Sequence, residues 1–464
     1  MERKALETLI SWKNKQTRKP LIIYGARQVG KSYLIKELFA ENNYKSNYVY
    51  IDLNKETDIK NYILYGGINK SSIVDANEII NYISLSRNIK ISQNTLLIFD
   101  EAQECLPLIT ALKYFKQDRP ELPIIVSGSM VRIKIKRNQK SNNQNGKESF
   151  FFPVGAADSL TIFPLTFEEF LMNYNNNLYN HIIEKYNNRE PLDNVFHQKA
   201  MEILYKYLLV GGMPEVVKNY ISSNDLLSTR NDIDSIFNDY LGDMELYQAS
   251  SESIIRSKAI FESIYTQLDK ESKDFKSSLV KPGLKSRDIR SPKDYLVLAN
   301  IIYESKQVKE HVSFPLKEEN ENNYRLYLLD NGLLAKQAKI NMATFIDRNN
   351  QNTLSGILFE NYVATELSAN GIDLFYWKGK ATAEFEFLLE YNNQIIPIDV
   401  KKSTGPLTSL KSYKDFNKCP LAIKISSNNF GYNSEKKILT IPLYEVFLLI
   451  QDIKNNTSFL DTLI

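Results

Sequence analysis

Short apolar runs alternate with amphipathic runs along the first 130 residues. The first apolar run is followed by a glycine-bounded turn and then by YLIKELFAENN at 33–43, whose apolar positions recur with helical spacing. Strands that alternate with helices favour a parallel sheet covered by helices, so we expect an α/β domain here. The apolar runs of strand length stand at 20–24, 47–53, 95–99 and 122–126.

The pattern changes farther along the chain. Residues 165–248 show helical periodicity without strand alternation. Residues 250–315 show a helix, a polar basic turn, a second helix and a short strand, and a helix followed by alternating strands occupies 355–401. We therefore expect four segments: a sheet domain at 1–164, a helical segment at 165–248, a mixed segment at 249–345 and an α/β domain at 346–464.

Composition and charge restrict the class of protein. The 464 residues are 43% hydrophobic and 24% charged, as in folded proteins, and a typical size of about 150 residues per domain predicts about three domains. The 58 basic and 55 acidic residues leave a net charge of +3, which excludes a generally polycationic protein but not a local basic surface. The two cysteines lack metal-type spacing, and no run of about 18 apolar residues occurs. We expect a cytoplasmic protein without a membrane span.

A phosphate-binding loop is predicted between the first strand and its helix. Gly25, Gly30, Lys31 and Ser32 fit G-x-x-x-x-G-K-[ST], in which backbone N–H groups cradle phosphates at a helix N-terminus. Lys31 is expected to reach the β- and γ-phosphates, and Ser32 to ligate Mg²⁺. The predicted nucleotide contacts in this loop are Gly25, Ala26, Arg27, Gln28, Val29, Gly30, Lys31, Ser32 and Tyr33.

Polar residues end two further strands of the expected sheet. Asp100 and Glu101 follow the apolar run of TLLIFDEAQ, at the strand edge where open α/β sheets bind ligands. We assign Asp100 to the Mg²⁺ and assign Glu101 and Lys31 to catalysis, with Glu101 as the base for water. Ser127 ends the next strand and is expected to sense the γ-phosphate.

Several short blocks, taken together, resemble a known family. They are GARQVGKS at 25–32, FDEAQ at 99–103, SGS at 127–129, FPLTFEEFL at 163–171, GGMPEVV at 211–217, YLLDNGLLA at 327–335, YW at 376–377 and IPIDVK at 396–401. Their order and spacing resemble those of AAA-type ATPases of the AAA_14 class that carry a C-terminal DUF4143 region. The chain departs from this pattern at Ala156 and Ala157, where a basic residue is expected after PVG.

The resemblance has implications for fold, cofactors and partners. It implies ATP and Mg²⁺ as cofactors, a P-loop sheet of the ASCE type, a helical lid at 165–248 and a winged-helix-like module at 249–345. Many AAA relatives form rings, so a homo-oligomer is a candidate state, although no residue demands it. In the expected lid, the segment from Gly211 to Pro214 is either a hinge or a helix stop.

Two segments concentrate positive charge. The stretch from Arg132 to Lys147 holds six basic and no acidic residues, and the stretch from Lys273 to Lys293 holds seven basic and two acidic residues. Such segments are either solvated surfaces or contacts for nucleic-acid phosphates. DNA is therefore a candidate partner, without an argument for base reading.

A second constellation of charged residues lies near the C-terminal end. A helix carries Glu360, the strand AEFEFLLE places Glu384 and Glu386 on one face, and IIPIDVKK places Asp399 and Lys401 on one face. If 391–394 form a hairpin loop, opposed positions sum to 785 and Glu386 stands opposite Asp399, with Cβ atoms about 5 Å apart. Like charges so placed need a positive group between them, either a divalent cation or Lys401.

This acid, acid-x-Lys order is the pattern of PD-(D/E)XK nucleases, to which the DUF4143 resemblance also points. By analogy, Glu360, Glu386 and Asp399 would hold Mg²⁺, and Lys401 would position or activate water. Glu386 stands where Asp is usual, and Asp399 stands where Glu is usual. An active nuclease, a non-cleaving nuclease-like domain and a structural hairpin all remain open.

Two functions follow from the sequence. The first is Mg²⁺-dependent ATP hydrolysis coupled to DNA binding or processing through a nuclease-like C-terminal domain. The second is a nucleotide-gated regulatory or interaction protein whose C-terminal domain does not cleave.

Overall fold

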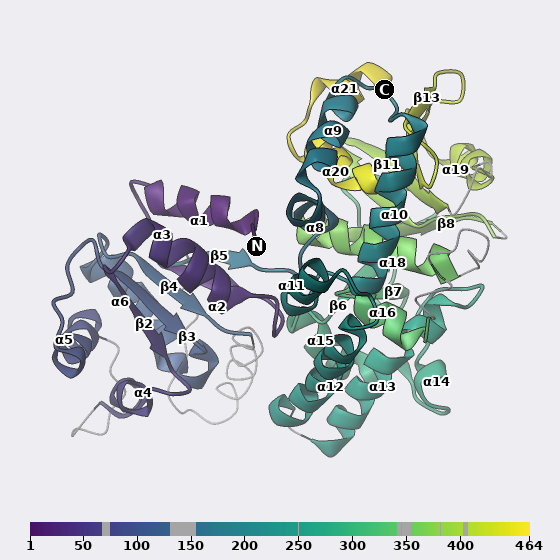
Figure 1. Cartoon of the computed structure of the whole chain (residues 1–464). Helices are drawn as coiled ribbons and strands as arrows, with labels where there is room; N and C mark the ends of the chain where they lie inside the picture. Colours follow the sequence, from purple (N-terminus) through teal and green to yellow (C-terminus); the bar gives the residue numbers. More distant parts are fainter. Residues whose placement is uncertain are drawn as a thin grey trace. The chain divides into compact units, whose positions relative to one another are not determined.

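The chain divides into two compact units. The computed structural model describes residues 1–66, 75–129, 155–248, 250–340, 345, 354–380, 382–401 and 407–464. Arg3–Phe163 form the smaller unit, and Pro164–Ile464 together with Met1–Glu2 form the larger one (Figure 1). The chain therefore crosses between the units at two peptide bonds, one after Glu2 and one after Phe163.

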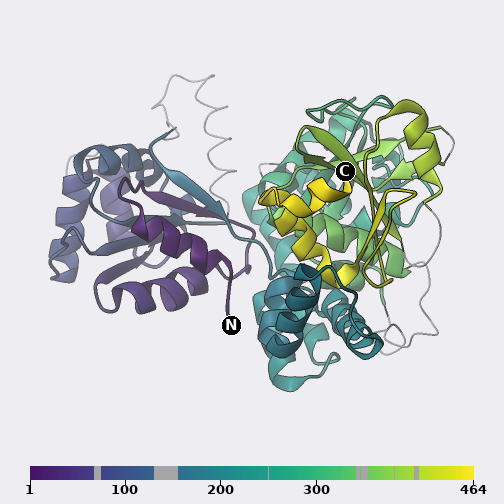
Figure 2. The same ribbon diagram turned by 90° about the horizontal axis from the view of Figure 1, so that it is seen from above.

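The smaller unit is built on a five-stranded sheet. All of its pairings are parallel, in the order β2-β3-β4-β1-β5, and helices lie on both sides of it (Figures 1 and 2). This confirms the predicted α/β class and parallel sheet. The strands are β1 (Leu21–Tyr24), β2 (Tyr48–Asp52), β3 (Leu96–Asp100), β4 (Ile124–Ser127) and β5 (Asp158–Thr161). The helices are α1 (Ala5–Asn14), α2 (Lys31–Tyr33), the π-helical Leu34–Ala40, α3 (Glu41–Tyr44), α4 (Thr57–Tyr65), α5 (Ala76–Arg87), the 3-10 turn Ala102–Glu104 and α6 (Leu106–Asp118).

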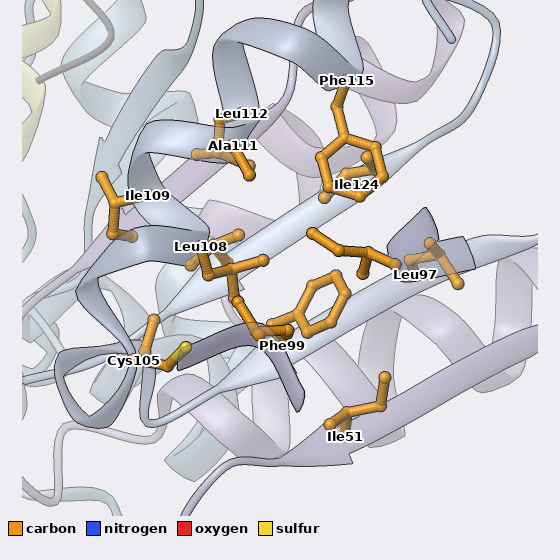
Figure 3. Close-up of a cluster of buried hydrophobic side chains, with 14 of the residues drawn as sticks. Ile51, Leu97, Phe99, Cys105, Leu108, Ile109, Ala111, Leu112, Phe115 and Ile124 are labelled. Atoms are coloured by element: carbon orange, nitrogen blue, oxygen red, sulfur yellow. The ribbon is translucent and has the colours of Figure 1, made fainter. Parts of the chain in front are cut away.

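The core of this unit explains why the strand sequences are apolar throughout. Every residue of β3 is buried, because helices cover both faces of a parallel sheet. Leu97 and Phe99 of β3 pack with Ile124 of β4 against Leu108 and Phe115 of α6 (Figure 3). This packing fixes β3 and β4 side by side, so their polar C-terminal ends lie at the same edge.

The larger unit begins with helices, as the periodicity of 165–248 predicts. A helical pair and a strand hairpin follow over 251–328. The elements are α8 (Phe167–Tyr174), α9 (Asn176–Asn187), α10 (Asn194–Val210), α11 (Pro214–Ser223), α12 (Thr229–Tyr247), α13 (Ser251–Leu268), α14 (Ser277–Val280), α15 (Ser286–Leu298), β6 (Ile302–Gln307), β7 (Tyr324–Leu328) and α16 (Asn331–Gln337).

Two mixed sheets complete the larger unit. One has the order β7-β6-β8-β9 and the other β10-β11-β12-β14-β13. Because β6 pairs in parallel with β8, one sheet contains strands from both sides of residue 345, where the sequence predicts a segment boundary. The remaining elements are α18 (Leu354–Ala369), β8 (Leu374–Lys378), β9 (Glu384–Phe385), β10 (Phe387–Tyr391), β11 (Gln394–Lys401), α19 (Ser409–Phe416), β12 (Ala422–Ser426), β13 (Gly431–Asn433), β14 (Ile438–Pro442), the 3-10 turn Leu443–Glu445, α20 (Val446–Lys454) and α21 (Ser458–Leu463).

The β10–β11 hairpin has the register that the sequence predicts, with a tighter turn. Tyr391 pairs with Gln394, so the opposed positions do sum to 785, but the loop contains Asn392 and Asn393 alone. Both residues have positive φ angles of 44° and 61°, the backbone of a two-residue hairpin turn whose twist matches the strands. The ladder ends at Phe387, so Glu386 is not a ladder partner of Asp399.

The GGMPEVV and YLLDNGLLA blocks meet at a buried carboxylate. Gly211 follows α10 with φ of 76°, and a Cβ there would lie 2.3 Å from Asp330 Oδ1. Gly212 N donates to Asp330 Oδ2 at 2.6 Å, and Leu165 N donates to Gly212 O at 2.7 Å. Pro214 begins α11, so the segment ends one helix and starts the next at a hydrogen-bonded junction.

Candidate functional site

The loop between β1 and α2 is shaped by close packing. Gly25 has φ of 144°, and a Cβ at this position would lie 2.3 Å from the carbonyl oxygen of Ile162. Any side chain would therefore push the loop away from the strand end beside it. Arg3, which is 8% exposed, donates to Val29 O at 3.2 Å and to Phe163 O at 2.8 Å. These contacts hold the loop from two sides.

Lys31 lies across this loop. Its ammonium donates to the carbonyl oxygens of Gly25 at 3.1 Å and Ala26 at 2.6 Å, and the residue is 8% exposed. Ser32 and Tyr33, which follow Lys31 in α2, are exposed, as is Arg27 in the loop. The loop therefore presents a positive charge and several backbone groups where the sequence predicts phosphate contacts.

Asp100 is the centre of a hydroxyl network that joins α2, β2 and β4 to β3. Ser32 Oγ donates to its Oδ2 at 2.6 Å, Tyr50 OH donates to Oδ2 at 2.5 Å, and Ser127 Oγ donates to Oδ1. Burial favours the protonated acid, but the hydrogen bonds from Ser127, Ser32 and Tyr50 outweigh it and lower the pKa of Asp100. The carboxylate is therefore held ionised next to the phosphate-binding loop.

Glu101 has a different environment although it is the adjacent residue. It has a positive φ of 55° and its carboxylate accepts a hydrogen bond from Gln103 Nε2. Burial raises the pKa of Glu101 and outweighs the hydrogen bond from Gln103; the charge of Asp100 adds to the shift, and Lys31 and Arg27 oppose it. A carboxylate with a raised pKa is a better proton acceptor, as a base for water requires.

The structure brings together the main polar residues that the sequence predicts for this site, and it adds two residues that the sequence does not predict. Ser32, Asp100 and Ser127 are in direct hydrogen-bond contact, and Ser127 is fully buried with its hydroxyl directed to Asp100. Tyr50 was missed, although its place on β2, two residues before the strand's end at Asp52, aims it at the same edge. Arg3 was also missed, because no local pattern connects residue 3 with the loop.

Family models match three parts of the chain. Residues 17–171 match the family model AAA_14, described as an AAA domain. The chain carries an AAA domain. Residues 201–344 and 355–445 match the domains of unknown function DUF8612 and DUF4143. No curated protein matches the chain.

Two solved structures match the chain at low sequence identity. A Walker-type ATPase of Pyrococcus abyssi has 15% sequence identity, and the match covers 73% of this chain and 96% of that chain, with a TM-score of 0.41. DnaA from Aquifex aeolicus, in a structure bound to AMPPCP, has 14% identity over 64% of this chain and 89% of that chain, with a TM-score of 0.29.

In the DUF4143 region, the structure gathers the four residues that the nuclease analogy selects. Lys401 Nζ lies 2.8 Å from Asp399 Oδ1 and 4.0 Å from Glu386 Oε1. Val400 N donates to Glu386 Oε2 at 3.1 Å. Glu360, from α18, is joined to Glu386 through a shared cation, Lys273.

Lys273 and Arg325 are the cations that sequence reasoning did not place here. Lys273 Nζ forms an ion pair with Glu360 and lies 3.6 Å from Glu386 Oε1 and 3.7 Å from Glu384 Oε1. Arg325, which is fully buried in β7, pairs with Glu384 and lies 3.5 Å from Glu360 Oε1. The sequence places Lys273 in a basic stretch that predicts a surface. Arg325 is a single arginine within a strand, and no neighbouring residue indicates its ion pairs.

The charges in this cluster shift the protonation of the two acids in opposite directions. Burial, with the charges of Asp399 and Glu360, raises the pKa of Glu386 to about 7, although Lys273 opposes the shift. Burial also disfavours the ionised form of Glu360, but Lys273 and Arg325 outweigh it and lower the pKa of Glu360. Within the described residues, no group of three or more His, Cys, Asp or Glu side chains is placed to hold a metal ion.

Several basic side chains in the stretch from Lys273 to Lys293 form ion pairs with acidic residues of the same chain. Lys293 is 7% exposed and pairs with Glu304, and Lys273 pairs as described above. Arg290 Nη2 lies 2.8 Å from Glu321 Oε2 at the surface. Exposed basic residues in and beside α14 and α15 are Lys276, Lys281, Lys285, Arg287 and Arg290. The other basic stretch, Arg132 to Lys147, lies outside the described residues.

Among the helices that the structure describes, none combines the length and apolar composition needed to cross a membrane.

Proposed function

We propose that the AAA domain binds ATP together with Mg²⁺ and hydrolyses it. The observation that carries the proposal is the hydrogen bond of 2.6 Å between Ser32 Oγ and Asp100 Oδ2, which joins the phosphate-binding loop to the carboxylate of β3. Hydroxyl and carboxylate oxygens are the hard ligands that Mg²⁺ prefers, so this pair fits the ion. Ser32 and Asp100 would hold Mg²⁺, which neutralises phosphate charge when bound.

The remaining side chains of the site have separable roles in this proposal. The backbone of residues 25–32 and the ammonium of Lys31 bind the phosphates, and phosphate oxygens replace the carbonyls of Gly25 and Ala26 as acceptors of that ammonium. Glu101 accepts the proton of the attacking water. Ser127 keeps Asp100 ionised and oriented, and so acts on the γ-phosphate through Asp100.

The proposal is tested by comparing turnover with nucleotide binding. Glu101→Gln keeps the size of the side chain but removes the base, so kcat should fall at least about 10²-fold while ATP still binds. Lys31→Ala should lose binding and turnover together. Both quantities are measured by steady-state hydrolysis and by equilibrium binding of a non-hydrolysable ATP analogue.

Glu37→Gln is the matched control for Glu101→Gln. Glu37 lies on the helical run that continues from Lys31, and its carboxylate is at the surface, 3.2 Å from Lys36 Nζ. The turnover of this variant should equal that of the wild type. Wild-type turnover by the Glu101→Gln variant would show that Glu101 is not the base.

We propose that DNA is the partner to which ATP hydrolysis is coupled. Support comes from the exposed basic residues in and beside α14 and α15, which form a helical pair followed by the β6–β7 hairpin. Phosphate contacts by such residues give salt-dependent affinity without base recognition. A homo-oligomer stays a candidate state of the active protein.

A further inference from the structure

The carboxylates of the DUF4143 region lie in a cluster that contains its own cations. Among the described residues, the cluster combines five acidic and five basic side chains, so its formal charge is balanced. The acids are Asp274, Glu360, Glu384, Glu386 and Asp399, and the bases are Lys273, Arg325, Lys378, Lys401 and Lys424.

Lys273 has the contacts that a metal ion would have. Its ammonium lies within 4 Å of the carboxylates of Glu360, Glu384 and Glu386, which come from α18, from β9 and from the residue between β9 and β10. A divalent cation in a carboxylate cluster is held in the same way, by oxygens that converge from several elements. Lys273 comes from the segment between α13 and α14, far from these acids in the sequence.

Asp399 gives a second, independent indication of a cation site. It is 1% exposed, and Lys401 Nζ lies 2.8 Å from its Oδ1, whereas Oδ2 has no hydrogen-bond partner among the described residues. Buried carboxylate oxygens normally accept hydrogen bonds or bind cations. Asp399 therefore has capacity for a further positive partner.

Charge balance decides whether that partner is a metal in the natural protein. Adding a divalent ion to five acids and five bases would leave two uncompensated positive charges in a largely buried place, which is costly. Removing the ammonium of Lys273 would lower that excess to one charge and vacate a position that faces three carboxylates. The natural chain thus does not fit a metal here, and a chain without Lys273 fits it better.

We infer that the ammonium of Lys273 takes the place of a divalent cation in the DUF4143 region. The region binds no Mg²⁺ or Mn²⁺ at these carboxylates. Shortening Lys273 opens a latent divalent site formed by Glu360, Glu384 and Glu386, the three carboxylates that face its ammonium. This inference does not depend on the proposed hydrolysis of ATP.

The test measures Mn²⁺ bound to the full-length chain, without nucleotide, by electron paramagnetic resonance. Lys273→Ala should bind about one more equivalent of Mn²⁺ than the wild type, and Lys273→Ala with Glu386→Gln should lose it. Lys276→Ala is the matched control, because Lys276 is exposed in the same stretch, and it should behave as the wild type. Lys273→Gln, which removes the charge and keeps a polar side chain, provides the same readout if the alanine variant is insoluble.

Two results would overturn the inference. One is a wild-type chain that binds an equivalent of Mn²⁺ which Glu386→Gln removes. The other is soluble Lys273→Ala or Lys273→Gln protein that gains no Mn²⁺. ATP turnover, measured in parallel, should be the same in wild type and Lys273 variants, so a failure of the proposed ATP hydrolysis appears in all samples and is distinguishable.

Discussion

Adjacent residues in this protein are given opposite acid–base properties by their surroundings. Asp100 receives three hydroxyl donors, which stabilise its anion, whereas Glu101 is buried beside that anion and has its pKa raised. A metal-side acid must stay ionised, and a base must take up a proton. The two side chains thus have the properties that their proposed roles require, and the difference lies in their hydrogen-bond partners.

The contribution of Tyr50 to Asp100 leads to a pH-dependent prediction. The Tyr50 hydroxyl helps to lower the pKa of the folded carboxylate, so its stabilising effect is present above the unfolded pKa and is lost as the pH falls through the folded one. Tyr50→Phe should lower the free energy of unfolding by about 1–2 kcal/mol at pH 7, and the difference should shrink below about pH 4.

The measurement is urea unfolding from pH 3 to pH 7. Tyr48→Phe is the matched control on the same strand, since its hydroxyl bonds to Glu41 at 3.3 Å on the surface and should matter little. A Tyr50→Phe loss that is independent of pH would mean that Tyr50 stabilises the fold by packing and not through Asp100.

The sequence predicts site residues that belong to short motifs, but it does not predict residues that reach the site from distant parts of the chain. Lys31, Ser32, Asp100 and Glu101 occur in short patterns with fixed spacing, because a strand end and a helix start impose it. Lys273 approaches Glu360 from 87 positions away. No pattern in the sequence shows such a contact, because the packing of separate elements creates it.

At the level of elements, the β10–β11 hairpin shows what strand periodicity can and cannot establish. Alternation fixes the faces of the strands, so the register that sums to 785 is correct. It leaves the length of the loop open, because a two-residue and a four-residue loop around the same centre give the same register. It also leaves open that the ladder stops at Phe387, because β9 pairs with β8.

The positive φ angles of the turn give a prediction on stability. Asn393 is exposed with φ of 61°, a conformation that costs glycine nothing. Asn393→Gly should raise the free energy of unfolding by about 0.5 kcal/mol, and Asn393→Ala should lower it by about 1 kcal/mol, since alanine tolerates this region poorly. The pair is compared by urea unfolding at neutral pH. Equal stability of the two variants would contradict a turn that requires left-handed backbone at this position.

For the whole molecule, the two peptide crossings are the covalent route between the proposed ATP site and the larger unit. On the side of the AAA domain, Arg3 bonds both Val29 O of the loop and Phe163 O. In the larger unit, Leu165 N bonds Gly212 O. On the larger-unit side of the other crossing, Glu2 N donates to Asn173 Oδ1 at 2.8 Å. Each crossing is therefore anchored by hydrogen bonds on both sides, and a change at Val29 O would reach both crossings through Arg3.

Coupling between DNA binding and ATP hydrolysis can be tested in the full-length chain. If the exposed basic residues near α15 bind DNA and the crossings transmit the event, duplex DNA should raise the rate of ATP hydrolysis severalfold. The combined variant Lys281→Ala, Lys285→Ala and Arg287→Ala should lose this stimulation but keep the basal rate, because none of these residues lies in the AAA domain.

Salt dependence of DNA binding, measured by fluorescence anisotropy, identifies the contacts. The slope of log K against log salt changes by about 0.9 for each phosphate contact, so the triple variant should lose a slope of about 2–3. Lys218→Ala, Lys436→Ala and Lys454→Ala, combined, remove three exposed charges elsewhere in the larger unit and should leave stimulation and slope unchanged. Equal losses in both triple variants would mean that DNA responds to total charge and not to this surface, and unchanged hydrolysis with bound DNA would exclude coupling.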